Sequence, residues 1–182
     1  MILVFLADGF EEIEALTPVD ILRRAGLDVK TAAVGGCGLV VTGSHGIPVT
    51  ADMSAEDASA LGGIDMAVLP GGMPGAKNLD TDPTVDAVLS RVHAEGGILA
   101  AICAAPMVLG HRGYLRGKRA TCFPGFEGEL AGAEYTAGRV EEDGRIVTAC
   151  GMGAATEFAL ALVRILKGGD AAEKLRSAIL AK

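Results

Sequence analysis

The chain has 182 residues and a formal net charge of −7; half of its residues are hydrophobic, but only 4% are aromatic and tryptophan is absent. This length predicts one domain, spanning residues 1–182, with an aliphatic core of substantial size. The acidic balance argues against a nucleic-acid-binding protein, because neutralising phosphates requires clustered lysine and arginine.

The hydrophobic pattern predicts strands that alternate with helices. Residues 2–6 form an apolar run, which we interpret as a buried strand and not as a signal peptide, because acidic residues follow it at once. Further strands are expected at residues 29–34, 67–69, 98–102, 120–122, 139–142 and 146–149, and a hairpin-like pair at 39–42 and 47–49. Helices are expected at residues 11–24, after residue 54, at about 83–95, directly after residue 103, at 154–167 and at 171–180.

This order of elements predicts an α/β fold with a parallel sheet that is covered by helices on both faces. No apolar run is long enough to cross a membrane, so we expect a cytoplasmic protein without a membrane partner. Three features follow predicted strands, at the sheet edge where such folds bind ligands. They are the acidic segment 8–14, the pair Gly71-Gly72, and Cys103.

The strongest of these features is the segment 100–106, AAICAAP, in which a strand turns into a helix at Cys103. Small neighbours permit the strained turn of a nucleophile elbow, although alanines stand here in place of the glycines of G-x-S-x-G. A thiol at a helix N-terminus is favoured as the thiolate, which makes it more reactive. We therefore expect Cys103 to be the reactive centre, with a buried structural cysteine as the alternative.

A carboxyl group and a glycine pair at the same predicted sheet edge could assist such a thiol. Glu14 lies in the first turn of the first predicted helix, and a carboxyl group kept protonated by burial could donate to a thiolate or move protons on a substrate. Acids in a first turn can also simply complement the helix dipole, which is our interpretation of Glu12. Gly71 and Gly72 let the backbone approach a ligand, so an N–H group of this loop and that of Ala104 would form an oxyanion hole.

No motif indicates a cofactor or a metal ion. The segment after Gly71 lacks the closing residues of a phosphate loop, and too little chain follows Gly151 for a dinucleotide-binding unit.

The cysteines are Cys37, Cys103, Cys122 and Cys150. They lack C-x-x-C spacing, so we expect free thiols; the last two are interpreted as structural, although either could approach the mouth of the pocket. None of the three histidines has a neighbour that suggests a metal site or triad, but His45 could line a pocket.

Taken together, these residues resemble the ThiJ/PfpI (DJ-one) superfamily, especially its bacterial YajL-like and human DJ-one-like branch. The resemblance covers essentially the whole chain. It is carried by ADGFEEIE at 7–14, PVD at 18–20, RRAG at 23–26, LPGG at 69–72, AAICAAP at 100–106 and EFAL at 157–160. It implies a flavodoxin-like three-layer α/β/α sandwich, similar to class I glutamine amidotransferases, and a homodimer.

The resemblance also implies roles for individual residues. Cys103 takes the place of the family's oxidation-sensitive thiol, and Glu14 takes the place of the protonated acid beside it. The N–H groups of Gly72 and Ala104 take the place of the oxyanion hole. Arg24 matches an arginine of an anion-binding spot near the cysteine.

Some positions depart from the family pattern. Phe123 stands where some members carry a histidine beside the cysteine, which argues against a protease with a Cys-His dyad. His45 and Cys150 replace arginines of the human-type anion-binding spot, which puts anion binding there in doubt. Gly71 and His45 remain our candidates for contact with the substrate.

The implied activity is that of an enzyme that acts on reactive dicarbonyls such as methylglyoxal without glutathione. The thiolate of Cys103 would form a hemithioacetal, Glu14 would move a proton between the two carbons, and hydrolysis would release a hydroxy acid such as lactate. A deglycase would use the same covalent step on glycated amines or thiols. The alternative is a redox sensor or holdase chaperone of the oxidative-stress response that works through oxidation of Cys103. Thiazole biosynthesis, suggested by the family name alone, has no supporting motif here.

Overall fold

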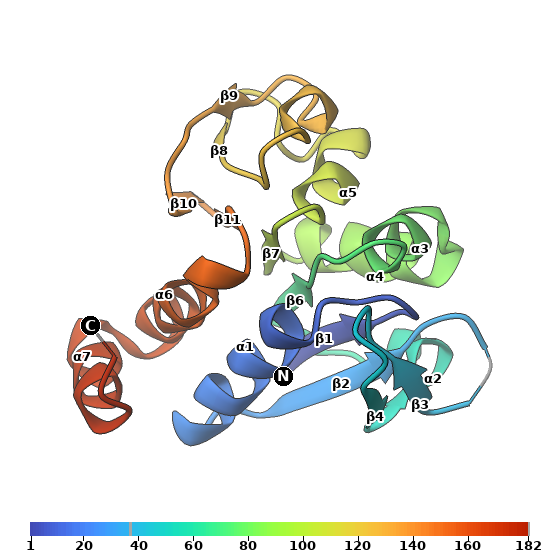
Figure 1. Cartoon of the computed structure of the whole chain (residues 1–182), viewed down its shortest axis with the longest axis horizontal. Helices are drawn as coiled ribbons and strands as arrows, with labels where there is room; N and C mark the ends of the chain where they lie inside the picture. Colours follow the sequence, from blue (N-terminus) through green and yellow to red (C-terminus); the bar gives the residue numbers. More distant parts are fainter. Residues whose placement is uncertain (37, 182) are drawn as a thin grey trace.

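A seven-stranded sheet forms the centre of the protein, in the order β10-β11-β7-β6-β1-β2-β5 (Figure 1). The computed structural model describes residues 1–36 and 38–181; Cys37, one of the expected free thiols, lies outside the described residues. The strands are β1 (Ile2–Leu6), β2 (Val29–Ala33), β5 (Met53–Ser54), β6 (Met66–Leu69), β7 (Ile98–Ile102), β10 (Val140–Asp143) and β11 (Ile146–Ala149). Neighbouring strands are parallel except β10 and β11, so the sheet is mostly parallel, as predicted.

The middle of this sheet consists of short apolar runs that are buried along their whole length. β1 reads ILVFL and β7 reads ILAAI, and every residue of both strands is buried. β1 lies between β2 and β6, with Ile2 in register with Val29 on one side and Met66 on the other. Uninterrupted apolar runs are expected where helices cover both faces of a parallel sheet, because neither face meets water.

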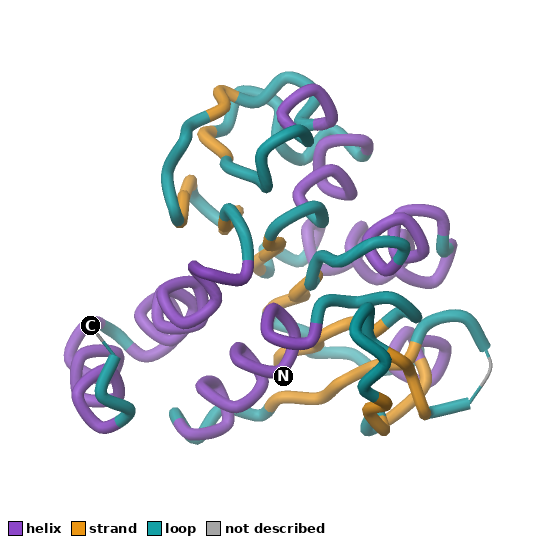
Figure 2. The backbone as a smooth tube through the Cα atoms, viewed as in Figure 1, coloured by secondary structure: helices purple, strands orange, loops and turns teal. Residues whose placement is uncertain are grey.

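Helices form a layer on each face of the sheet (Figures 1 and 2). One layer consists of α1 (Glu12–Arg24), α6 (Ala155–Lys167) and α7 (Gly169–Ala178). The other consists of α2 (Ala55–Ser59), α3 (Gly75–Thr81), α4 (Pro83–Ala94) and α5 (Pro106–His111). Side chains of β1 alternate between the two faces of the sheet. Leu3 and Phe5 pack against the α2–α5 layer, and Val4 packs against the layer that contains α1. This is the predicted three-layer α/β/α fold.

Two small sheets lie outside the central one. β3 (Val40–Thr42) and β4 (Pro48–Thr50) form the antiparallel hairpin that the sequence predicts, and β8 (Arg119–Ala120) pairs in parallel with β9 (Glu134–Tyr135). The loop of the hairpin carries Ser44 and His45 to the first turn of α1. None of the helices that the structure describes is both long enough and apolar enough to span a lipid bilayer.

The elements that the sequence does not predict carry weak local signals. α3 begins at Gly75 after Pro74, which makes no side-chain capping hydrogen bond, so the usual start signals of a helix are missing. β5 and β9 have two residues each, which is too short for a periodicity to show. α5 begins at Pro106 and not directly after Cys103, because residues 103–105 form a turn.

Candidate active site

Cys103 follows the last residue of β7 with its backbone in the left-handed region, at a φ of 65°. A residue other than glycine rarely adopts this region, and holding one there costs about 1–3 kcal/mol. Neighbouring backbone fixes the turn: the N–H of Cys103 donates to the carbonyl of Ala149 at 2.8 Å, and its own carbonyl accepts from the N–H of Phe123 at 2.8 Å. The strained turn at a strand end, expected from the small residues around Cys103, is present.

Glu14 lies in the first turn of α1 and is fully buried. Its Oε2 accepts the N–H of Gly71 at 3.0 Å, whereas Oε1 has no hydrogen-bond partner among the described residues. Burial is the largest influence on this carboxyl group and raises its pKa from 4.5 to about 7. The hydrogen bond with the Cys103 thiol acts in the opposite direction, and the charge of Glu11 adds to the rise. The Glu14 carboxyl group therefore titrates near neutral pH.

The thiol of Cys103 is held in its protonated form. Burial, and then the negative charge of Glu14, raise its pKa from 9 to about 12. The nearby N–H groups of Gly72 and Ala104 lower the pKa of this thiol but do not overcome the rise. Our expectation that a helix N-terminus would favour the thiolate is therefore wrong for the resting site, because α5 begins only at Pro106 and burial dominates.

The two glycines after β6 bring the backbone into contact with this pair. A Cβ atom at Gly71 would lie 2.6 Å from Oε2 of Glu14 and 2.7 Å from Cβ of Cys103, so no side chain fits there. Gly72 has a φ of 84°, and a Cβ atom there would lie 2.4 Å from the backbone nitrogen of Glu11. The close backbone approach that Gly71-Gly72 predicts is thus found, and the N–H groups of Gly72 and Ala104 meet at the sulfur.

Arg24, predicted as an anion-binding residue, does not lie beside Cys103 within one chain. It ends α1, ten residues after Glu14, which corresponds to about 15 Å along a helix. Its Nε donates to Asp20 at 2.7 Å, and both side chains are more than half exposed.

His45, the other predicted substrate contact, is bound to Glu12. Its N–H donates to Oε1 of Glu12 at 2.8 Å, and its Nδ1 lies 2.8 Å from Oε2. Burial opposes ionisation of Glu12, but the hydrogen bonds from His45 outweigh it and lower the pKa of Glu12 to about 2. Glu12 therefore does more than complement the helix dipole: it fastens the hairpin loop to α1.

Within the described ranges, one group of side chains has the spacing of a metal site. Glu11, Glu12 and His45 each offer one ligand atom, and these atoms lie within 4.8 Å of one another. All three are already engaged in the fold, because Glu11 caps α1 through the N–H of Glu14 at 2.7 Å, and Glu12 and His45 bind each other.

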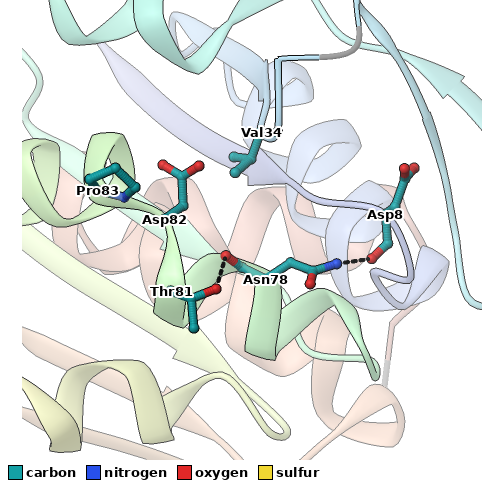
Figure 3. Close-up of a pocket in the computed structure, with 7 residues that line it drawn as sticks. Asp8, Val34, Asn78, Thr81, Asp82 and Pro83 are labelled. Carbon is teal, nitrogen blue, oxygen red and sulfur yellow. Dashed lines mark hydrogen bonds between the residues drawn. The ribbon is translucent and has the colours of Figure 1, made fainter.

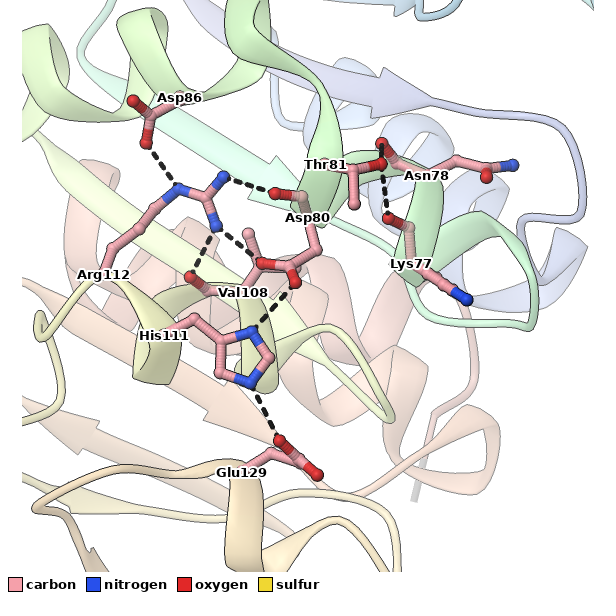
Figure 4. A network of polar contacts seen from close by, with 9 residues as sticks. All are labelled: Lys77, Asn78, Asp80, Thr81, Asp86, Val108, His111, Arg112 and Glu129. Carbon is pink, nitrogen blue, oxygen red and sulfur yellow. Dashed lines mark hydrogen bonds and ion pairs between the residues drawn. The ribbon is translucent and has the colours of Figure 1, made fainter.

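Two other polar regions lie away from Cys103. A hollow of about 280 Å³ lies at the ends of β1 and β2, where Asn78 donates to the carbonyl of Asp8 at 2.9 Å (Figure 3). Asp8 of the acidic segment 8–14 lines it, but neither Cys103 nor Glu14 does. In the α2–α5 layer, Arg112 and His111 both bind Asp80, and His111 also contacts Glu129 (Figure 4).

The fold and the site together define a three-layer α/β protein in which a cysteine on a strained turn at a strand end contacts a buried glutamate. The chain belongs to the DJ-1/PfpI family, whose sequence profile matches residues 1–165. A Parkinson disease protein 7 homolog from Danio rerio is 38% identical over 183 residues, which cover 99% of this chain and 96% of the relative. A deglycase from Pyrococcus abyssi is 30% identical over 168 residues, which cover 91% of this chain and 99% of the relative.

Solved structures agree with this assignment. A DJ-1 superfamily protein from Salmonella typhimurium, determined as a mutant, superposes with a TM-score of 0.94 at 35% identity and covers 100% of this chain and 98% of that one. Toxoplasma gondii DJ-1 in an oxidised form has a TM-score of 0.94 at 36% identity, with 99% and 97% coverage. The family and the fold class inferred from the sequence are confirmed.

Proposed function

We propose that the chain is a cysteine-dependent enzyme that converts reactive dicarbonyls such as methylglyoxal into hydroxy acids without glutathione. The observation that carries this proposal is the contact between the Cys103 thiol and Glu14, a buried carboxyl group with a pKa of about 7. A base with a pKa close to the working pH is suited to general acid–base catalysis. The similarity to a Pyrococcus abyssi protein named a deglycase supports this class of reaction.

In the first step, the carboxylate of Glu14 takes the proton of the Cys103 thiol while the sulfur bonds to the aldehyde carbon. The aldehyde oxygen becomes an alkoxide, which the N–H groups of Gly72 and Ala104 stabilise as an oxyanion hole. Glu14 then gives its proton to this oxygen. The product is a hemithioacetal on Cys103.

In the second step, Glu14 removes the proton from the former aldehyde carbon and returns a proton to the neighbouring carbonyl carbon, while the hydroxyl proton passes from the first oxygen to the second. The first carbon is thereby oxidised to a thioester and the second is reduced to an alcohol, so no external electron acceptor is needed. Water then hydrolyses the thioester, which releases lactate from methylglyoxal and restores the thiol of Cys103. On glycated amines or thiols, a deglycase reaction would use the same attack by Cys103.

The test is the formation of lactate from methylglyoxal by the reduced protein in the absence of glutathione. Cys103→Ser and Glu14→Gln are expected to lose turnover. Cys122→Ala is the matched control, because this thiol is buried against the opposite helix layer and should be dispensable. A folded, reduced wild-type protein that forms no lactate would rule out the proposed activity.

A second candidate function is redox sensing or holdase activity through oxidation of Cys103. The N–H groups of Gly72 and Ala104 point at the sulfur, so they would also hold the oxygens of a sulfinic acid. The similarity to Toxoplasma gondii DJ-1, solved in an oxidised form, favours this candidate. Protection of an aggregating client by the oxidised protein, lost in Cys103→Ser and unaccompanied by turnover, would support it over the enzyme.

We also propose that the protein is a homodimer and works in the cytoplasm, where thiols such as Cys103 stay reduced. Two apolar side chains are exposed next to Glu14. Ile13 on α1 is 50% exposed, and Met152, whose backbone N–H faces the Glu14 carboxyl group, is 48% exposed. Clustered exposed apolar side chains mark surfaces that another molecule covers. A dimer would also allow Arg24 of one copy to approach Cys103 of the other.

A further inference from the structure

Cys150 lies beside Cys103 at the ends of two adjacent parallel strands. β7 and β11 are in register with Ile102 opposite Ala149, so each cysteine is the next residue of its strand. The N–H of Cys103 donates to the carbonyl of Ala149 at 2.8 Å, which extends the hydrogen-bond ladder one residue past β7. Neighbouring strands lie about 5 Å apart, so the two cysteine Cα atoms fall within the range that a disulfide spans.

The two thiols also share one side of the sheet. Cys103 and Cys150 are both partly buried and both pack against the apolar cluster under α1 and α6. Cys122, by contrast, is 1% exposed and belongs to the cluster on the opposite face. Among the described cysteines, Cys150 is thus the one placed to meet Cys103.

The turn that follows Cys150 borders the reactive pair. A Cβ atom at Gly151 would lie 3.9 Å from Oε1 of Glu14, and the N–H of Met152 faces the same carboxyl group. The N–H of Cys150 donates to the carbonyl of Arg139 at 3.0 Å, and the side chain of Arg139 forms an ion pair with Glu157 at 2.8 Å.

From this placement, we propose that Cys150 is a resolving cysteine that converts oxidised Cys103 into an intramolecular disulfide. A peroxide transfers one oxygen to the sulfur of Cys103, which becomes a sulfenic acid while the peroxide is reduced to water or an alcohol. The thiolate of Cys150 attacks this sulfur, the S–S bond forms, and the hydroxyl group leaves as water after taking a proton.

The disulfide diverts Cys103 from the irreversible sulfinic acid and can be reversed by a dithiol. This role does not depend on the enzymatic activity proposed above, because the reaction consumes a peroxide and no dicarbonyl. It does imply that any activity of Cys103 is switched off reversibly during exposure to peroxide.

The test is peptide mapping by mass spectrometry under non-reducing conditions after the reduced protein is treated with a small excess of hydrogen peroxide. The wild-type protein is expected to lose two hydrogens and to yield a Cys103–Cys150 linked peptide that disappears with dithiothreitol. Cys150→Ser should yield no linked peptide and instead gain two oxygens at Cys103, which dithiothreitol does not remove. Cys122→Ala is the matched control and should behave like the wild-type protein.

Circular dichroism and thermal melting of each variant establish that it is folded. The proposal is overturned if the wild-type protein accumulates sulfinic Cys103 as fast as Cys150→Ser does. It is equally overturned if Cys103 links to any other cysteine, whether within one chain or between two.

Discussion

A Cβ atom at Gly71 would lie 2.6 Å from Oε2 of Glu14, the oxygen that already accepts the N–H of Gly71 at 3.0 Å. The same atom would lie 2.7 Å from Cβ of Cys103. We therefore expect Gly71→Ala to push the carboxyl group away from the thiol. Since a misplacement of about 1 Å costs on the order of 100-fold in rate, kcat with methylglyoxal should fall by about that factor.

Gly128→Ala is the matched control for this substitution. No atom lies within 4 Å of a Cβ built at Gly128, and its backbone needs no left-handed conformation, so kcat should stay unchanged. Circular dichroism of both variants separates a local displacement from unfolding. If Gly71→Ala kept wild-type turnover, contact between Glu14 and Cys103 would not be required for the reaction.

The activity should depend on pH through Glu14. Its pKa is raised to about 7 by burial, so the carboxylate that accepts the thiol proton is lost as the pH falls below neutrality. We expect kcat/KM to fall about tenfold per pH unit well below pH 7 and to level off above it. Glu14→Asp, which keeps a carboxyl group but shortens its reach, should retain an acid limb at lower overall activity. A wild-type midpoint near 4.5 would show that the catalytic base is a different, solvent-exposed acid.

The same group makes stability depend on pH with a defined sign. Between about pH 4.5 and pH 7, folded Glu14 keeps a proton that the unfolded chain has lost, so the free energy of unfolding should fall as the pH rises through this window. Glu14→Gln removes this dependence and should be more stable than the wild-type protein at pH 8, by up to about 3 kcal/mol. Urea unfolding at about pH 5 and pH 8 measures both effects. Equal stability differences between the two proteins at both pH values would contradict a buried, proton-sharing Glu14.

The contact between Cys103 and Glu14 is predictable from the sequence because its signals are local. Cys103 stands between small residues at the end of an apolar run. Glu14 lies eight residues after the run at 2–6, and Gly71 lies two residues after the run at 67–69. Parallel strands that end at one sheet edge then bring the three together. What the sequence does not show is the degree of burial, which sets the pKa of Cys103 and reverses the expected preference for a thiolate.

Contacts between distant segments also leave no local signal. Glu12 and His45 lie 33 residues apart and meet only because the β3–β4 hairpin folds back onto α1. The position of His45 in a turn-rich segment suggests a pocket residue, whereas in the structure His45 binds the buried Glu12. Asp80 and Arg112 are similarly separated by 32 residues, and α3, which carries Asp80, has no start signal in the sequence.

Arg112 should make a large contribution to stability. Its side chain is only 13% exposed, and its Nη1 and Nη2 donate to the carboxylate and the backbone carbonyl of Asp80, each at 2.8 Å. Its Nε also donates to Asp86 at 2.7 Å, so one guanidinium joins α5 to α3 and α4 (Figure 4). Arg112→Met leaves these acids without their cation, and the free energy of unfolding should fall by about 3 kcal/mol.

Arg24→Met is the matched control, because Arg24 forms an ion pair with Asp20 in which both side chains are more than half exposed. Such pairs contribute about 0.5 kcal/mol or less, since water screens the charges. Urea unfolding of the three proteins at one pH and salt concentration compares the two sites directly. A similar small loss in both variants would mean that the Arg112 network behaves like a surface ion pair. A large loss in Arg112→Met alone would show that the partly buried guanidinium holds the α2–α5 layer together.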